Sequence, residues 1–174
     1  MEHGNILELR KFVAPEFVFG PGASDLAGQY LRNFQADSIL LVTDPGLEAA
    51  GWAGKVKARL LEQGLRVTVF SEVSPNPRDE EVMAGAEVYR SRGCEAILGL
   101  GGGSPMDCAK GIGAVSTNER RVLDFEGVDQ VAQPCPPMVC VPTTSGSAAD
   151  VSQFAIINDT TRRVKIAIVS KAMV

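Results

Sequence analysis

Three consecutive glycines, Gly101 to Gly103, follow a short apolar run and precede a helix-like segment. Ser104 is predicted to be the N-cap of that helix and Pro105 its first residue, with Asp107 placed to complete a capping box. The first amides of a helix are unpaired and carry about half a positive charge, so they attract phosphate. Glycine lets a phosphate come close to the backbone. The stretch therefore predicts a phosphate-binding turn between a strand and a helix.

The glycine pattern alone leaves an alternative open, which is a tight strand-to-helix turn without a ligand. The dinucleotide fingerprint G-x-G-x-x-G fails here, because Ser104 or Met106 occupies its last place. The Walker A pattern is also absent. The choice between a ligand site and a plain turn depends on the rest of the chain.

A second loop of small polar residues follows another apolar run. Met138 to Val141 is predicted to be a buried strand, and Thr143, Thr144 and Ser147 follow it beside Gly146. Hydroxyl groups in such a loop suit pyrophosphate or ribose oxygens. Hydroxyls also cap helices, so this loop is weak support by itself. Two such loops at the ends of strands in one sheet favour a ligand site.

Asp44 and Asn76 also follow predicted strands. In open α/β sheets ligands bind beyond the carboxyl ends of the strands. A carboxylate at position 44 would accept hydrogen bonds from the hydroxyls of an adenosine ribose and would repel a 2'-phosphate. The alternative for Asp44 is a turn or helix-capping aspartate. Asn76 is predicted to be the N-cap of a helix that begins at Pro77, and a ligand contact remains possible.

The elements that must position these residues alternate between strands and helices. Apolar runs predict strands at 38–43, 66–70, 96–100 and 138–141, and capping and periodicity predict helices at 24–31, 47–63, 77–92 and 104–115. Such alternation gives a Rossmann-like α/β fold, a parallel sheet with helices on both faces. Two further strands are expected at 153–157 and 164–169. Lys165 lies in the second, where it must point to solvent or to an anion. The apolar run ends at Val174, which we interpret as a truncation.

Composition narrows the classes of partner. A net charge of -4 argues against binding to nucleic acid or to an anionic membrane. No apolar run approaches the ~20 residues of a membrane span, and the first residues do not form a signal peptide, so we expect a cytoplasmic protein. The four cysteines fit neither a zinc site nor a disulfide framework. The only histidine, His3, is expected to be solvated.

Five motifs in order, VTDPG, SPNP, GGGSPMDCAK, PTTSGSAADVSQF and VKIAIVS, closely resemble the iron-containing (group III) alcohol dehydrogenase family. The resemblance implies that residues 1–174 form a dehydroquinate synthase-like NAD(P)-binding domain and that a C-terminal helical, metal-binding domain is absent. It implies NAD rather than NADP as cofactor. It assigns cofactor contacts to Asp44, Asn76, Gly102, Gly103, Ser104, Thr143, Thr144, Ser147, Ser152, Phe154 and Lys165.

The same resemblance implies the reaction of the whole protein. It would be the oxidation of a primary alcohol or diol to the aldehyde, or the reverse, by hydride transfer. The family's Fe²⁺ is held by one aspartate and three histidines, which would lie beyond this chain, so the fragment should carry no catalytic residue and be inactive alone. A homo-oligomer is expected, with the extended run 16–19 able to pair across a dimer. The alternatives are a maleylacetate reductase, a glycerol dehydrogenase, or a nucleotide-binding fragment without catalysis.

Overall fold

The computed structural model describes residues 14–173. The predicted solvation of His3 lies outside the described residues. The helices are α1 (Ala27–Asn33), α2 (Pro45–Ala49), α3 (Trp52–Glu62), α4 (Asp79–Ser91) and α5 (Gly103–Asn118), with short 3-10 turns at Ala23–Leu26, Val122–Phe125 and Lys171–Met173. The strands are β1 (Ser38–Val42), β2 (Arg66–Phe70), β3 (Ala96–Gly101), β4 (Gly127–Val128), β5 (Met138–Pro142), β6 (Phe154–Asp159) and β7 (Val164–Val169).

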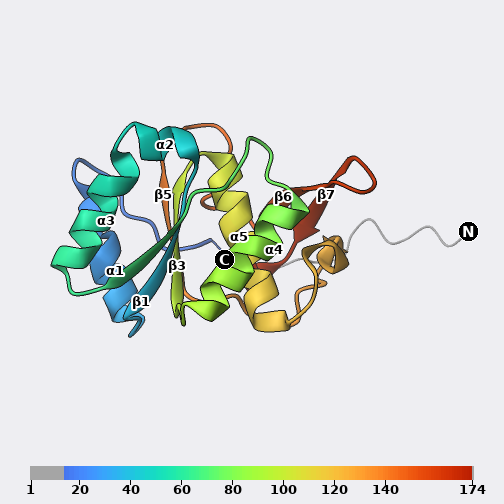
Figure 1. Ribbon diagram of the computed structural model, residues 1–174, viewed down its shortest axis with the longest axis horizontal. Coiled ribbons are helices and arrows are strands. Elements are labelled where there is room, and N and C mark those ends of the chain that lie inside the picture. The colour runs from blue at the N-terminus through green and yellow to red at the C-terminus, as the bar shows by residue number, and fades with distance from the viewer. Residues whose placement is uncertain (1–13, 174) are drawn as a thin grey trace, which may run out of the picture.

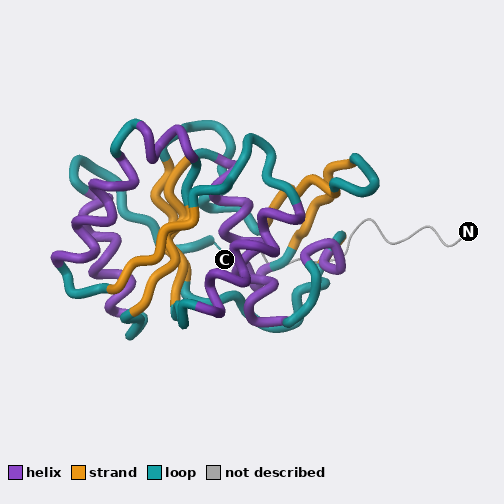
Figure 2. The backbone as a smooth tube through the Cα atoms, in the orientation of Figure 1, coloured by secondary structure: helices purple, strands orange, loops and turns teal. Residues whose placement is uncertain are grey.

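Four strands form a parallel sheet in the order β2-β1-β3-β5. Helices α1 and α3 lie on one face of this sheet, and α4 and α5 lie on the other (Figure 1). The expected α/β architecture, a parallel sheet with helices on both faces, is therefore confirmed. Because all four strands run the same way, the loops that follow β1, β3 and β5 come out at one edge, which is the upper edge in Figures 1 and 2.

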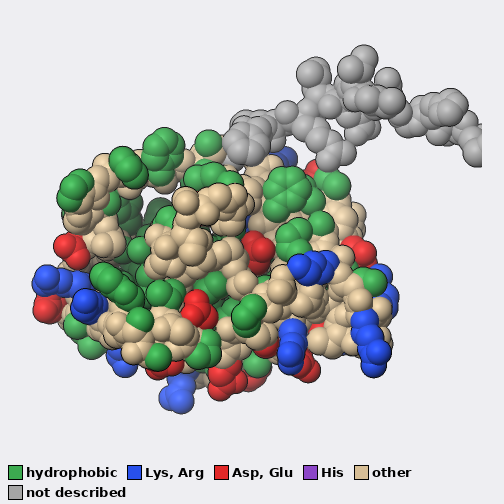
Figure 3. Space-filling view, turned by 90° about the horizontal axis from the view of Figure 1, so that it is seen from above, with side chains coloured by type: hydrophobic (Ala, Val, Ile, Leu, Met, Phe, Trp, Pro, Cys, Tyr) green, Lys and Arg blue, Asp and Glu red, His purple; other side chains and the backbone are tan. Residues whose placement is uncertain are grey.

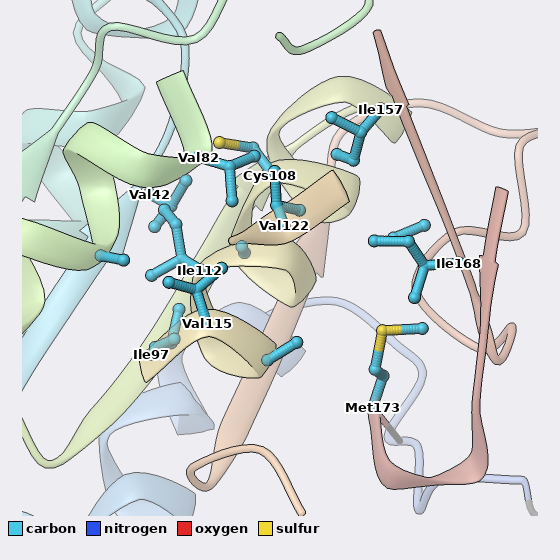
Figure 4. Packing of buried hydrophobic residues seen from close by; sticks show 14 of the residues in the cluster. Val42, Val82, Ile97, Cys108, Ile112, Val115, Val122, Ile157, Ile168 and Met173 are labelled. Atoms are coloured by element: carbon cyan, nitrogen blue, oxygen red, sulfur yellow. The ribbon is translucent and has the colours of Figure 1, made fainter. Parts of the chain in front are cut away.

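The sheet buries alternate residues in two separate hydrophobic clusters. Ile39 and Leu41 of β1 pack with α1 and α3, whereas Leu40 and Val42 pack with α4 and α5. Strand side chains point alternately to opposite faces, so a strand covered on both sides must be apolar throughout. Figure 4 shows Ile112 of α5 beside Val42 and Ile97 of the main sheet.

A second, smaller sheet packs against α5. Its strand order is β4-β7-β6, with β6 and β7 antiparallel and β4 parallel to β7. The two predicted strands are confirmed, and their apolar patterns do not indicate that they leave the main sheet. Ile157 and Ile168 join the same hydrophobic cluster as α5, which Figure 4 shows from close by. This hairpin therefore lies directly beside the helix that follows the glycine turn.

Several local predictions were wrong. The helix predicted over 47–63 is broken at Gly51, whose φ of 79° is left-handed and ends α2. Residues 16–19 belong to no strand of the described chain, and their pairing across a dimer stays a prediction. Helix α1 buries Ala27 and Leu31 and leaves Phe34 49% exposed. Strand β5 is only half-buried, since it lies at the edge of the sheet. Within residues 14–173, none of the helices combines the length and the apolar character needed to cross a membrane.

Candidate functional site

The two polar loops lie side by side at the carboxyl edge of the main sheet. Gly101 and Pro142 are paired at the ends of β3 and β5. The Thr143 amide donates a hydrogen bond to the Gly101 carbonyl oxygen at 2.9 Å. A Cβ built on Gly102 would lie 3.1 Å from Thr144 Oγ1, and one on Gly103 would lie 3.3 Å from Ser147 Cβ. The glycines therefore permit a close approach between the two loops.

The first turn of α5 presents backbone amides at this place. The helix begins at Gly103, and its N-cap is Gly102 in an extended conformation, with φ -84° and ψ -160°. The prediction of Ser104 as N-cap and Pro105 as first residue was wrong by two positions. Pro105 has no N–H, so the amides of Gly103 and Ser104 are the donors at this helix end. Two bare amides on a 16-residue helix suit an anion.

The Ser104 hydroxyl does not cap α5 but holds the loop that follows β2. Its Oγ accepts a hydrogen bond from the Asn76 amide at 3.1 Å. Asn76 has a left-handed φ of 59°. Its Oδ1 accepts from Lys165 Nζ at 2.6 Å, and its carbonyl oxygen accepts from Asn158 Nδ2 at 2.8 Å. Ser104, Asn76 and Lys165 are thus brought together from three distant segments.

Asn76 is not the N-cap of α4, and Pro77 is not its first residue. The N-cap is Arg78, whose amide donates to Glu81 at 3.0 Å. Asn76 is therefore free of the structural role that the sequence predicted for it. Lys165 is exposed to solvent, as one of the two predicted alternatives requires, and its ammonium group also donates to Asn76 Oδ1. Its contact with an anion stays a prediction.

Asp44 adopts the capping geometry that was the alternative in the sequence. Its Oδ1 accepts from the Leu47 amide at 3.0 Å and caps α2. Asp44 directly follows Thr43 at the end of β1, next to β3 in the sheet. The cap uses one carboxylate oxygen, so the residue can also face a ribose. Figure 3 looks down on this edge, where most Lys and Arg side chains lie at the periphery.

Ser152 and Phe154 are held by a lysine that the sequence did not assign to them. Lys110 of α5 is only 2% exposed, and its Nζ donates to the Ser152 carbonyl at 2.5 Å and to the Phe154 carbonyl at 3.1 Å. Burial lowers the pKa of Lys110. At this degree of burial the Lys110 side chain is not solvated.

Asp107 is a second polar side chain of α5 that binds the backbone of β6, as Lys110 does. The Asp107 carboxylate accepts a hydrogen bond from the Ile156 amide instead of completing a capping box. The sequence contains a signal that both residues are buried. Apart from Asp107 and Lys110, the stretch from Met106 to Val115 consists of apolar residues and glycine, and a helix that is apolar all round is buried. Polar side chains within it must then find partners inside the protein.

The cysteines are free thiols, as expected. Cys94 and Cys108 are buried and Cys135 and Cys140 are half-buried. Burial raises the pKa of all four, to about 12 for Cys135 and about 11 for Cys140. In the part of the chain that the structure describes, no group of three or more His, Cys, Asp or Glu side chains could hold a metal ion. We therefore assign no metal chemistry to these residues.

Comparison with known proteins decides the family. The sequence model of the family described as iron-containing alcohol dehydrogenase matches residues 14–174. The chain belongs to the iron-containing alcohol dehydrogenase family. It is 41% identical over 154 residues to 1,3-propanediol dehydrogenase of Citrobacter freundii, a match that covers 87% of this chain and 40% of that protein. It is 36% identical over 160 residues to NAD-dependent methanol dehydrogenase of Bacillus methanolicus, covering 92% and 42% respectively.

A solved structure of a 1,3-propanediol oxidoreductase superposes on the chain with a TM-score of 0.91 at 36% identity, covering 96% of this chain and 44% of that one. The chain thus spans about two fifths of the length of the iron-containing alcohol dehydrogenases that it matches. The fold expected from the resemblance is confirmed by this superposition. The activity of the whole protein is a separate matter, because most of each relative lies outside the matched region.

The Asp107 side chain of this family member gives a pH prediction. Burial raises its pKa from 3.8 to about 6, while Lys110 on the same helix and the Ile156 amide act in the opposite direction. The folded chain therefore holds this proton more tightly than the unfolded chain. The stability that the proton contributes is full below about pH 4 and is lost as pH rises to about 6.

Replacing this carboxyl by an amide should remove that pH dependence. The parent should lose stability as pH rises from 4.5 to 7, whereas Asp107→Asn should not. Over this range we expect the free energy of unfolding of Asp107→Asn, relative to that of the parent, to rise by on the order of 1–3 kcal/mol. Urea unfolding of both chains across this range measures the difference. Glu81 lies near this helix in both chains, whereas Cys108 and Lys110 interact with the Asp107 charge, so loss of that interaction is part of the measured difference. A difference that does not change with pH would contradict the raised pKa.

Proposed function

We propose that the chain is the NAD-binding part of an iron-dependent alcohol dehydrogenase that oxidises a primary alcohol or diol to the aldehyde, or catalyses the reverse reaction. The observation that carries this proposal is the contact between the two loops, with Gly102 against Thr144 and Gly103 against Ser147. Bare amides and hydroxyls in one place suit a pyrophosphate. The names of the relatives, NAD-dependent methanol dehydrogenase among them, support the cofactor and the substrate class.

In this proposal, different residues bind different parts of the cofactor. Gly102, Gly103 and Ser104 bind the pyrophosphate, and Thr143, Thr144 and Ser147 close over it from the second loop. Asp44 binds the adenosine ribose. Asn76, Ser152, Phe154 and Lys165 complete the cleft. The cofactor, when bound, supplies the hydride acceptor, and the role of this chain is to hold and orient it.

We further propose that residues 1–174 act as one cofactor-binding domain of a longer cytoplasmic protein that assembles as a homo-oligomer. The family's iron would be held by residues outside this chain. The chain alone is then inactive towards alcohols. Its partners are small-molecule alcohols or aldehydes, with no role for nucleic acid.

The first test is a titration of the chain with NADH, followed by fluorescence or calorimetry. We expect saturable binding with one site per chain. Affinity should be modest, because the nicotinamide end lacks cover from the rest of the enzyme. A folded chain that shows no saturation at millimolar NADH would rule out the proposed function.

The choice of NAD over NADP should depend on Asp44. We expect Asp44→Gly to raise the ratio of NADP to NAD affinity by about ten-fold, because a like-charge repulsion with the 2'-phosphate is removed. Loss of an N-cap to glycine costs only a few tenths of a kcal/mol, so the chain should stay folded. Asp44→Asn is the matched control, since asparagine keeps the α2 cap and removes the charge. Calorimetric titration of each variant with both cofactors measures the ratio, and an unchanged ratio in both variants would reject this role.

A further inference from the structure

Strand β6 is the last strand of the small sheet, and one of its edges pairs with β7. Along its other edge, the described residues show no neighbouring strand, only an isolated bridge between Asn158 and Arg78. The backbone groups of Phe154, Ile156 and Asn158 on that edge need partners from outside the sheet. The Asn158 amide donates to the Pro77 carbonyl at 2.8 Å. The other two groups are bound by side chains of α5.

Lys110 and Asp107 supply those side chains. Lys110 Nζ donates to the carbonyls of Phe154 and Ser152, and the Asp107 carboxylate accepts from the Ile156 amide. They lie three residues apart on α5, so they share one face of the helix. Lys110 as donor and Asp107 as acceptor thus make hydrogen bonds with residues 152–156 that a neighbouring strand would otherwise make.

The same helix begins with the phosphate-binding turn. Gly103 and Ser104 form its first turn, and Lys110 lies less than two turns further along. The packing of Ile112 and Val115 keeps this helix fixed against the main sheet (Figure 4). Any displacement of residues 152–156 relative to the turn would need these hydrogen bonds to break in a buried place.

We infer that Asp107 and Lys110 are positioning residues, which fix the Ser152–Phe154 segment at a set distance from the phosphate-binding turn so that the nicotinamide half of the cofactor is aligned with its pyrophosphate. This inference rests on the proposed function. Neither residue needs to touch the cofactor, since each acts through the backbone of β6. Lys110 is too deeply buried to serve as a phosphate ligand.

The test compares two ligands of the 174-residue chain. NADH spans both halves of the cleft, whereas ADP carries only the adenosine and the pyrophosphate. We expect Lys110→Met and Asp107→Ala each to weaken NADH binding by about ten-fold while ADP binding changes less than about two-fold, since part-buried backbone groups of residues 152–156 lose their partners. Asp107→Asn, whose amide oxygen can still accept from Ile156, should keep NADH affinity within about three-fold of the parent.

Two further measurements complete the design. Lys55→Met, on the exposed surface of α3, is the matched control and should change neither affinity. Hydrogen exchange at the Ile156 amide should become faster in Lys110→Met and Asp107→Ala, in the absence of any ligand. Both variants are included so that, if one of them fails to fold, the other still tests the positioning role.

The outcomes separate the two proposals. If the parent chain binds neither ADP nor NADH, the proposed function fails and the positioning role fails with it. If the parent binds both, and the variants lose both affinities equally or keep NADH affinity unchanged, only the positioning role is overturned. A selective loss of NADH affinity, restored in Asp107→Asn, supports the positioning role.

Discussion

Replacing Gly102 by valine should lower the affinity of the chain for NADH by about 100-fold or more, equivalent to about 2.7 kcal/mol. A Cβ at this position already lies 3.1 Å from Thr144 Oγ1 and 3.3 Å from Thr144 Cγ2. The two methyl groups of valine would fill the space in which a phosphate must reach the amides of Gly103 and Ser104. Calorimetric titration with NADH measures the loss.

The backbone at Gly102 makes this substitution informative. Its φ of -84° is accessible to valine, so the substitution does not strain the backbone, and the Thr144 side chain must shift to make room for it. The matched control is Gly54→Val on α3, where a Cβ would meet nothing within 4 Å. We expect the control to keep the parent's NADH affinity. Undiminished NADH binding by a folded Gly102→Val chain would mean that the phosphates lie elsewhere.

Truncating Ile112 to alanine should destabilise the chain by about 2–5 kcal/mol. The side chain is fully buried at the centre of α5, between the main sheet and α4. It fits against Gly85, where an added Cβ would overlap the Ile112 side chain. The cavity left by the truncation would loosen the contact that fixes α5, and with it the phosphate-binding turn. Urea unfolding followed by circular dichroism gives the free energy of unfolding.

Leu61→Ala serves as the control for this truncation. Leu61 is 50% exposed on α3, so its removal should cost no more than about 1 kcal/mol. If the two substitutions have equal effects, α5 is not held by the core in the way that the structure shows. NADH affinity measured below the unfolding transition should fall in Ile112→Ala and stay unchanged in Leu61→Ala.

The two central strands of the main sheet, β1 and β3, were predictable because burial on both faces demands continuous apolar runs. Residues 38–42 and 96–101 carry that pattern without interruption. Gly64 was also predictable as a helix end, since its φ of 80° suits glycine. The meeting of the two polar loops followed from the parallel topology, which puts all strand ends at one edge.

The details of the site depend on contacts between distant residues, which local patterns do not encode. Ser104 looks like a cap, yet its hydroxyl is taken by the Asn76 amide 28 residues away. The partner of Lys110 lies 42 residues further along the chain. The separation of β6 and β7 into a second sheet also follows from tertiary packing on α5 rather than from their apolar patterns.

The central claim is that the turn at residues 102–104 and the loop at residues 143–147 form one seat for a dinucleotide. Nuclear magnetic resonance of the ¹⁵N-labelled chain during an NADH titration tests it most directly. We expect the amides of both segments to shift together and to follow one saturation curve. Saturable binding that shifts neither segment, or only one of them, would contradict it.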